Sequence, residues 1–426
     1  MEHFMRKTTA TLFVAAATAA TLGLAGCSAG PQSSTGKDGE TVLTMSGWAD
    51  DGSAAAIIKQ FEKDNPGVKI DYTGLPWPGI LTQINTELVS GTASDIVVVF
   101  PGNGNPITAQ TLAKGNYLAD LSSSEWVSNY NDANKAVMGA DGKILMGANA
   151  FTIIPAIYNT QALEAVGATP PTTYSDVLAL CETAKAEGKF AYALAGVAGG
   201  NHHVIPFALT ASLVYGPNPD FVEQQTAGDA SFSDSEWTTA LDKYREMVDA
   251  GCFTPDATGT SIDVAQDQVA KGEALGIVTV SPQISDIEEM APEGTTFETA
   301  AFPATDDESE TILPVGLGAG YGVNAKSKNI DLAKKFVDFY LSEDGLKIAL
   351  DNGTAYPSAP VEGFTPPATL AGVSEQVQSD KTFSFPDQTW PNAVVNQTYV
   401  DGLQAFIGGQ LSAEELLKQM DEAFNG

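Results

Sequence analysis

Residues 24–30, LAGCSAG, form the one segment of this 426-residue chain whose residue types and spacing suggest covalent catalysis. Gly26, Ser28 and Gly30 match the pattern G-x-S-x-G, in which a serine on a sharp strand-to-helix turn attacks an acyl carbon. The neighbouring sequence does not provide such a turn. An uncharged run rich in alanine and threonine precedes the segment, and the polar residues PQSSTGKDGE follow it. We therefore do not expect Ser28 to be a nucleophile.

The same segment contains a second pattern. Residues 24–27, LAGC, resemble the lipobox that ends a bacterial lipoprotein signal, and the chain before them has a basic start, an uncharged middle and a small-residue exit. The run is long enough to span a membrane, but it is only weakly apolar and no stop-transfer pattern follows, so we expect cleavage. The resemblance implies that residues 1–26 are removed, that Cys27 is lipidated, and that residues 27–40 form a flexible linker.

Other residues suited to metal or redox chemistry are scarce. His202 and His203 are adjacent and cannot make a metal site without distant partners, and the sequence has no CxxC, HExxH, EF-hand or P-loop motif. We expect no cofactor and no metal. With Cys27 assigned to the lipid, Cys181 and Cys252 either pair in an oxidising exterior or remain buried thiols, and the sequence leaves both alternatives open.

Composition limits the partners of the chain. The leader carries Glu2, Arg6 and Lys7, so a mature chain of 400 residues retains 19 of the 21 basic and 52 of the 53 acidic residues, a net charge of −33. Such a surface repels phosphate backbones, so we expect no nucleic-acid partner. A chain of this length exceeds what one hydrophobic core usually organises, which predicts two domains.

Strands and helices alternate along the mature chain. Alternating apolar residues at 42–45 and 68–72 predict two strands, and Ile57, Ile58 and Phe61 lie on one face of a helix between them. Repeated glycines at 316–322 predict a strand that something approaches closely. Further expected strands lie at 95–100, 150–159, 190–196 and 274–280, and further helices at 79–89, from Thr173, from Ser233 to Gly251, at 261–271, at 329–350 and at 410–424. This order predicts an α/β protein with open, largely parallel sheets.

Several segments in this order resemble the extracellular solute-binding proteins of ABC importers, in the carbohydrate-binding group that includes maltose-binding protein. The resemblance rests on WADDGSAAAIIKQFEKDNPGVKIDY, ELVSGTASDIVVV, LAKGNYLADLS, DGKILMGANAFTIIPAIYNTQALEAVGATPPTTYSDV, VAKGEALGI and GYGVNAKSKNIDLAKKFVDFYLS, which together span nearly the whole mature chain. It implies a two-lobed periplasmic-binding-protein-like fold, joined by a hinge that the chain crosses more than once, with the ligand in the cleft between the lobes.

The same resemblance implies the lobe boundaries and the partners. The first lobe is expected to comprise residues 41–149 and 319–360, and the second lobe residues 150–318 and 361–426. The implied partners are a carbohydrate, with an oligosaccharide favoured, and an ABC-transporter permease. We expect a monomer held at the outer face of the cell membrane by its lipid anchor.

Candidate ligand-binding residues combine aromatic platforms, which cover the C–H faces of sugars, with polar groups for the hydroxyls. Trp48 follows the first strand, at the edge where open α/β sheets bind ligands, although a core position is the alternative. Trp390 lies in an irregular segment close to two prolines, and Trp77 ranks below both. The remaining candidates are Asp50, Asn103, Asn149, Phe151, Asn201, His202, Ser281, Gly318, Tyr321 and Tyr356.

Two departures from the family pattern affect this set. The usual Gly-x-Pro-Tyr pattern is missing near Asn149, and Ser281, Pro282 and Gln283 stand where the family commonly has a cleft tryptophan. The resemblance therefore implies that one stacking platform has been lost. The alternatives to a sugar receptor are a secreted carbohydrate-active hydrolase and a receptor of the same fold for a peptide, a polyamine or a metal.

Overall fold

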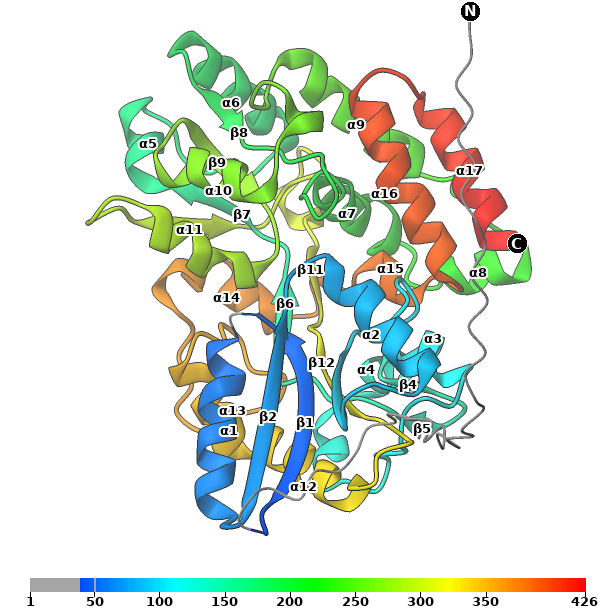
Figure 1. Cartoon of the computed structure of the whole chain (residues 1–426). Coiled ribbons are helices and arrows are strands. Elements are labelled where there is room, and N and C mark those ends of the chain that lie inside the picture. Colours follow the sequence, from blue (N-terminus) through cyan, green and yellow to red (C-terminus); the bar gives the residue numbers. More distant parts are fainter. Residues whose placement is uncertain (1–38, 50) are drawn as a thin grey trace, which may run out of the picture.

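Two sheets, each surrounded by helices, organise the chain into two lobes (Figure 1). The structure is a computed structural model that describes residues 39–49 and 51–426. The predicted signal, Cys27 and the candidate site residue Asp50 lie outside the described residues.

The sheet of the first lobe has the strand order β12-β3-β1-β2. It consists of β1 (Thr41–Trp48), β2 (Val68–Leu75), β3 (Ile96–Val99) and β12 (Gly320–Val323), with β1 parallel to both β2 and β3 and β12 antiparallel to β3. The carboxyl ends of β1, β2 and β3 therefore lie at the same edge of the sheet. A ligand site at this edge is what an open α/β sheet favours.

Helices cover this sheet with the faces that the sequence predicts. In α1 (Gly52–Asp64) the buried side chains include Ile57, Ile58 and Phe61. Phe61 packs edge-on against Phe336, with 5.2 Å between the ring centroids. The other helices of the first lobe are α2 (Gly79–Ser90), α3 (Ala109–Ala113), α4 (Asp132–Val137), α12 (Ile330–Tyr340) and α13 (Glu343–Asp351).

The sheet of the second lobe has the order β10-β7-β9-β8. It consists of β7 (Ala156–Asn159), β8 (Phe190–Tyr192), β9 (Ala274–Val278) and β10 (Phe297–Ala300). Only β8 and β9 pair in parallel, whereas β7 runs antiparallel to both β9 and β10. The α/β class is thus confirmed, but the expected largely parallel sheet is wrong for the second lobe, where two of the three strand pairs are antiparallel.

Only some helices of the second lobe begin at a residue whose side chain caps them. Thr173 and Asp176 form the predicted capping box of α6. The predicted box of Ser233 and Glu236 is wrong, because the helix begins at Trp237 and Glu236 makes no capping bond. These helices are α5 (Thr160–Ala165), α6 (Tyr174–Ala186), α7 (Val204–Thr210), α8 (Phe221–Ala227), α9 (Trp237–Ala250), α10 (Ile262–Ala270), α11 (Ile284–Met290), α14 (Ala371–Val377), α15 (Pro386–Thr389), α16 (Ala393–Ile407) and α17 (Ala413–Asn425), with a π-helix at Ala211–Tyr215.

A small sheet connects the lobes. In it β11 (Leu313–Leu317) pairs with β6 (Phe151–Ile153) and with β13 (Thr382–Phe383), and Figure 1 shows β6 and β11 between the two lobes. The predicted glycine strand is divided into β11 and β12. What approaches it is the chain's own backbone, since a Cβ at Gly320 would lie 2.6 Å from the Cα of Ala148.

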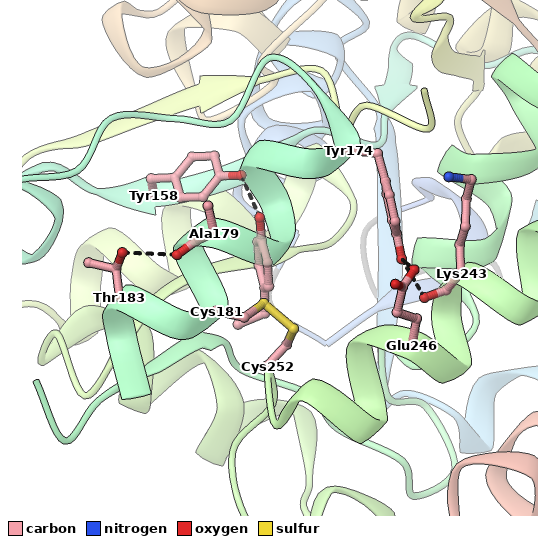
Figure 2. Close-up of a disulfide and its surroundings, with 9 residues drawn as sticks. Tyr158, Tyr174, Ala179, Cys181, Thr183, Lys243, Glu246 and Cys252 are labelled. Carbon is pink, nitrogen blue, oxygen red and sulfur yellow. Dashed lines mark hydrogen bonds between the residues drawn. A yellow bond between two sulfur atoms is a disulfide. The ribbon is translucent and has the colours of Figure 1, made fainter. Parts of the chain in front are cut away.

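A disulfide links α6 to Cys252, which lies two residues past the end of α9 in the second lobe. Cys181 and Cys252 are both buried, and Figure 2 shows the bond between the two elements. The structure thereby decides between the two alternatives that the sequence leaves open. The bond closes a loop across a sequence separation of 71 residues, for which chain-entropy arguments give a stabilisation of about 4 kcal/mol.

Candidate binding site between the lobes

Three aromatic side chains gather at the carboxyl edge of the first-lobe sheet. Trp48 ends β1, Trp77 follows β2, and Phe100 follows β3. The ring centroid of Trp48 lies 5.9 Å from that of Trp77 and 5.6 Å from that of Phe100. The ring centroids of Trp77 and Phe100 are 6.2 Å apart. Trp77 is 47% exposed, and the other two rings are partly buried. We call these three residues the aromatic cluster.

A hydrogen-bonded layer beneath the aromatic cluster holds Trp48 in place. The Tyr72 hydroxyl donates to the Trp48 carbonyl at 2.7 Å, and burial raises the pKa of Tyr72 to about 12, so the hydroxyl stays protonated as a donor. Gly47 permits this arrangement, since a Cβ there would lie 2.5 Å from the Tyr72 hydroxyl. Tyr321 belongs to the same layer, where it donates to Asp51 at 3.3 Å. Tyr321 is 1% exposed, so it supports the aromatic cluster from within the core.

The second lobe meets the aromatic cluster through the loop at residues 197–203. Gly199 in this loop has a φ of +83°, and a Cβ there would lie 2.7 Å from Nε1 of Trp77. The indole of Trp77 therefore contacts the opposite lobe. We call the surface along which the two lobes meet the interlobe seam; it includes the aromatic cluster, this loop and the residues from 102 to 104 and from 386 to 396.

The predicted residues of that loop are engaged in holding it. Asn201 accepts from the Ala195 amide at 2.8 Å and donates to the Val278 carbonyl at 2.9 Å. The two ring nitrogens of His202 lie 3.1 Å and 3.0 Å from backbone carbonyl oxygens, and burial lowers its pKa. These bonds fix the loop and leave Asn201 and His202 little capacity for a ligand.

His203 differs from its neighbour. Its Nδ1 is enclosed without a hydrogen-bond partner, and its ring packs edge-on against His202 and Phe207. Burial, followed by the adjacent His202, lowers the pKa of His203 to about 3, so the imidazole is neutral at physiological pH. A neutral imidazole with a free nitrogen can donate to or accept from a hydroxyl.

Asn103 connects the lobes directly. Its amide nitrogen donates to the Pro391 carbonyl of the second lobe, and its amide oxygen accepts from the Thr111 hydroxyl at 2.8 Å. A second hydrogen bond between the lobes comes from Asn396 of α16, which donates to the Gly104 carbonyl at 3.0 Å. The structure thus brings Asn103 to the interlobe seam, where protein groups occupy both ends of its amide.

Trp390 is placed differently from the sequence expectation. Its side chain is 0% exposed, and its ring packs against those of Phe207, Phe232, Trp237 and Tyr399. The expectation of an exposed stacking platform is corrected, because no face of the indole is free. The segment after α15 turns inward and buries the indole in the core of the second lobe.

The remaining predicted residues lie in the strands and loops that join the lobes. Asn149 is buried with an unpartnered Nδ2, whereas Phe151 is partly buried on β6. Ser281 is buried and accepts from the Ile153 amide at 3.1 Å. Gly318 donates from its amide to the Ala150 carbonyl at 2.9 Å. The Tyr356 hydroxyl accepts from Gln378 at 3.1 Å, and its ring packs on Phe364. Their contacts are made with the hinge rather than with the aromatic cluster.

From the sequence, Trp77 ranks below Trp48 and Trp390 as a candidate, and Phe100 is not a candidate. Both had a usable signal, because Trp77 lies five residues after the predicted strand at 68–72 and Phe100 ends the predicted strand at 95–100, near the sheet edge that favours Trp48. Phe100 reads as the last residue of its strand, and the prolines on both sides of Trp77 suggest a covering loop. The parallel register of β1 with β2 and β3 is what brings the two rings to Trp48.

Among residues 39–49 and 51–426 no group of three or more His, Cys, Asp or Glu side chains could hold a metal ion. Within that same part of the chain no helix is long and apolar enough to cross a membrane. A hollow of about 570 Å³ lies in the second lobe beside α8, and its lining includes Phe221, Asp229, Asp234 and Glu236. It belongs to one lobe only and none of the predicted site residues lines it.

The chain resembles a known protein family and several known proteins. The family model described as "Bacterial extracellular solute-binding protein" matches residues 47–347. A multiple sugar-binding protein from Streptococcus mutans is 22% identical over 329 residues, which cover 74% of this chain and 76% of the relative.

Two solved structures illustrate the likeness of fold. A chitin oligosaccharide binding protein gives a TM-score of 0.78 at 21% identity, covering 91% of this chain and 98% of that one. The solute-binding protein RafE in complex with raffinose gives a TM-score of 0.74 at 17% identity, covering 90% and 99%. At these identities the likeness establishes the two-lobed fold.

Proposed function

The chain belongs to the family of bacterial extracellular solute-binding proteins, and we propose that it captures an oligosaccharide between its lobes and delivers it to an ABC importer. The family consists of binding proteins, so the chain is a receptor and not an enzyme. The single observation that carries the carbohydrate assignment is the aromatic cluster of Trp48, Trp77 and Phe100 at the interlobe seam.

Aromatic faces at this position fit the chemistry of a sugar. The C–H faces of pyranose rings are apolar, whereas their hydroxyls need polar partners placed around them. The aromatic cluster offers the apolar faces, and the unpartnered Nδ1 of His203 on the same seam offers a polar group. The names of the relatives point to the same ligand class, since one is a multiple sugar-binding protein, one a chitin oligosaccharide binding protein and one was solved with raffinose.

Membrane attachment is a separate part of the proposal. Cys27 is the lipid-bearing residue by the lipobox resemblance, and the mature chain acts as a monomer at the outer face of the membrane. The lobe boundaries near residues 149, 318 and 360 remain predictions of the same kind. Replacing Cys27→Ala should release the protein from the membrane fraction with its ligand affinity unchanged, and retention of the variant at the membrane would refute the anchor.

The test of the carbohydrate assignment is a thermal-shift screen of mono- and oligosaccharides, followed by tryptophan fluorescence titration. A sugar at a hundredfold excess over its Kd adds about 2.7 kcal/mol to the free energy of unfolding, which raises the Tm by a few degrees. Trp77→Ala should weaken every sugar that binds, because it removes the exposed ring. Met290→Ala, an exposed apolar residue of the second lobe, serves as the control.

A screen in which no sugar shifts the Tm or the fluorescence would overturn the carbohydrate assignment. Peptides, polyamines and metal ions are then screened in the same way, since the fold also accommodates such ligands. Equal sugar affinity in wild-type protein and Trp77→Ala would instead move the site away from the aromatic cluster.

A further inference from the structure

The first lobe touches the second at one place more closely than side chains would allow. Gly102 has a φ of +73°, and a Cβ there would lie 2.5 Å from the Cα of Gln388 in α15. A Cβ at Gly104 would lie 2.8 Å from Oδ2 and 3.0 Å from the carbonyl oxygen of Asp387. The contact exists because residues 102 and 104 are glycines.

Side-chain amides reinforce this contact from both sides. Asn103 donates to the Pro391 carbonyl, and Asn396 donates to the Gly104 carbonyl at 3.0 Å. Gln388 donates to the carbonyl of Leu317, whose side chain packs in the core of the first lobe, at 3.0 Å. The loop 102–104 of the first lobe and the segment 386–396 of the second lobe are therefore joined by two side-chain hydrogen bonds.

The contact also encloses one carboxylate oxygen of Asp387, although the backbone amides of Asp387 and Gln388 lower the pKa of this carboxyl and so partly offset the effect of burial. Oδ1 of Asp387 is buried and makes no hydrogen bond, and no ion pair among the described residues includes Asp387. The titratable groups that face it are the hydroxyls of Tyr215 and Tyr399, which burial keeps protonated; the loop 102–104 contributes none. Nearby acceptors, the amide oxygens of Gln388 and Asn396, are unpartnered as well. An enclosed charge surrounded in this way is unfavourable.

We propose that the loop 102–104 and the segment 386–396 form an interlobe latch, and that the carboxylate of Asp387 makes this latch hold better in mild acid than at neutral pH. The latch rests on the proposed function, because closure of the lobes is how such a receptor retains its ligand. It adds a regulation of that same site, since the apparent affinity of a closed-state ligand rises with the closed population.

The direction of the pH dependence follows from the arrangement in which Asp387 is buried. Enclosure in the closed arrangement raises its pKa from 3.8 to about 6, whereas opening moves Gly104 away and restores a pKa nearer the ordinary value. The closed form then binds the proton more tightly. The penalty on closure is absent below the open-state pKa, grows as pH rises, and is complete above the closed-state pKa of about 6. Between pH 7 and pH 5 the closed-to-open ratio should rise about tenfold.

The experiment measures closure of the full chain directly, by single-molecule energy transfer without any sugar. Labels are placed at Val89→Cys in α2 and Val264→Cys in α10, exposed positions on opposite lobes. The closed-to-open ratio is expected to rise about tenfold from pH 7 to pH 5. Asp387→Asn should remove this rise, whereas Asp380→Asn, an exposed acid in the same lobe, should preserve it.

A second variant tests the glycine contact itself. Gly104→Ala should lower the closed population at both pH values, because the added methyl group meets Asp387 only when the lobes are closed. Gly79→Ala is the matched control, since a Cβ there meets nothing within 4 Å. If Gly104→Ala leaves the closed population unchanged, the proposed latch is overturned.

Two further outcomes would overturn the proposal: a closed population that is equal or undetectable at both pH values, and a rise that persists in Asp387→Asn. Failure of the carbohydrate assignment is seen separately, because the sugar screen reports binding and this measurement uses no sugar. If the protein closes in acid but binds no sugar, the latch is supported and the carbohydrate assignment is refuted.

Discussion

The two lobes use tryptophan in opposite ways. In the first lobe Trp48 and Trp77 stand with Phe100 at the edge of a sheet, and Trp77 is 47% exposed. In the second lobe Trp237 and Trp390 are fully buried, and their rings lie 6.2 Å apart among other aromatic side chains. Both groups have edge-to-face and tilted ring contacts at similar distances.

The difference teaches that ring contacts alone do not distinguish a binding platform from a core. What separates the two groups is the free face. The aromatic cluster follows three parallel strands, where chain directions leave the sheet edge open, whereas Trp390 is covered by α7, α9 and α16. The aromatic cluster keeps an exposed ring in Trp77, and this free face is what the proposed site uses.

Trp390→Ala should have the largest effect, and on stability. Removal of a fully buried indole costs about 3–5 kcal/mol through lost burial and the cavity left behind. Urea denaturation should show this loss at unchanged m-value. Sugar affinity per folded molecule should be retained, and a loss of affinity without a loss of stability would instead return Trp390 to the binding site.

Removing the disulfide comes next. Cys181→Ser together with Cys252→Ser should lower the free energy of unfolding by about 4 kcal/mol, since the bond constrains a long loop of the unfolded second lobe. Thermal unfolding of the double variant, with and without reductant, measures it. The aromatic cluster lies in the other lobe, so reductant should leave sugar binding to the wild-type protein intact at room temperature; loss of binding would connect the two lobes energetically.

His203, between the seam loop and the buried aromatic group, predicts an acid dependence. Its folded-state pKa of about 3 lies below the unfolded value of 6.5, so the unfolded chain takes up the proton first and stability falls as pH drops below 6.5. Between pH 7 and pH 5 this amounts to about 2 kcal/mol. In His203→Gln the dependence should be weaker by that amount. Because Asp387 acts with the opposite sign and is common to both proteins, the comparison cancels it.

Trp77→Ala should have the smallest effect, and on affinity only. Loss of one exposed ring weakens sugar binding about tenfold, equivalent to about 1.4 kcal/mol, while stability changes by less than about 0.5 kcal/mol. Fluorescence titration and urea denaturation of the same preparation separate the two quantities. A stability loss as large as that of Trp390→Ala would remove the contrast between the lobes.

Much of the fold could be predicted because it is local. The face formed by Ile57, Ile58 and Phe61, the capping box at Thr173 and the stop at Gly251 are each encoded within a few residues. The second sheet was harder, since β7 pairs antiparallel with β9 across more than a hundred residues and no local pattern specifies strand direction.

The candidate site was predicted less well, for a physical reason. Trp48 and Trp390 both have polar neighbours in the sequence, yet one is partly exposed and the other is enclosed. Asn201 and His202 are polar loop residues whose bonds are consumed by the backbone, which composition does not reveal. His203, the next residue, differs because its Nδ1 is buried without a hydrogen-bond partner.

The sequence by itself determined the α/β class, the order of its elements and the likeness to solute-binding proteins, because propensity, periodicity and capping act over short stretches of chain. The tertiary structure alone decided which aromatic rings keep a free face, that Cys181 and Cys252 pair, and that the glycines of the loop 102–104 meet Asp387 and Gln388. Those outcomes depend on the packing of segments tens to hundreds of residues apart, which no local pattern encodes.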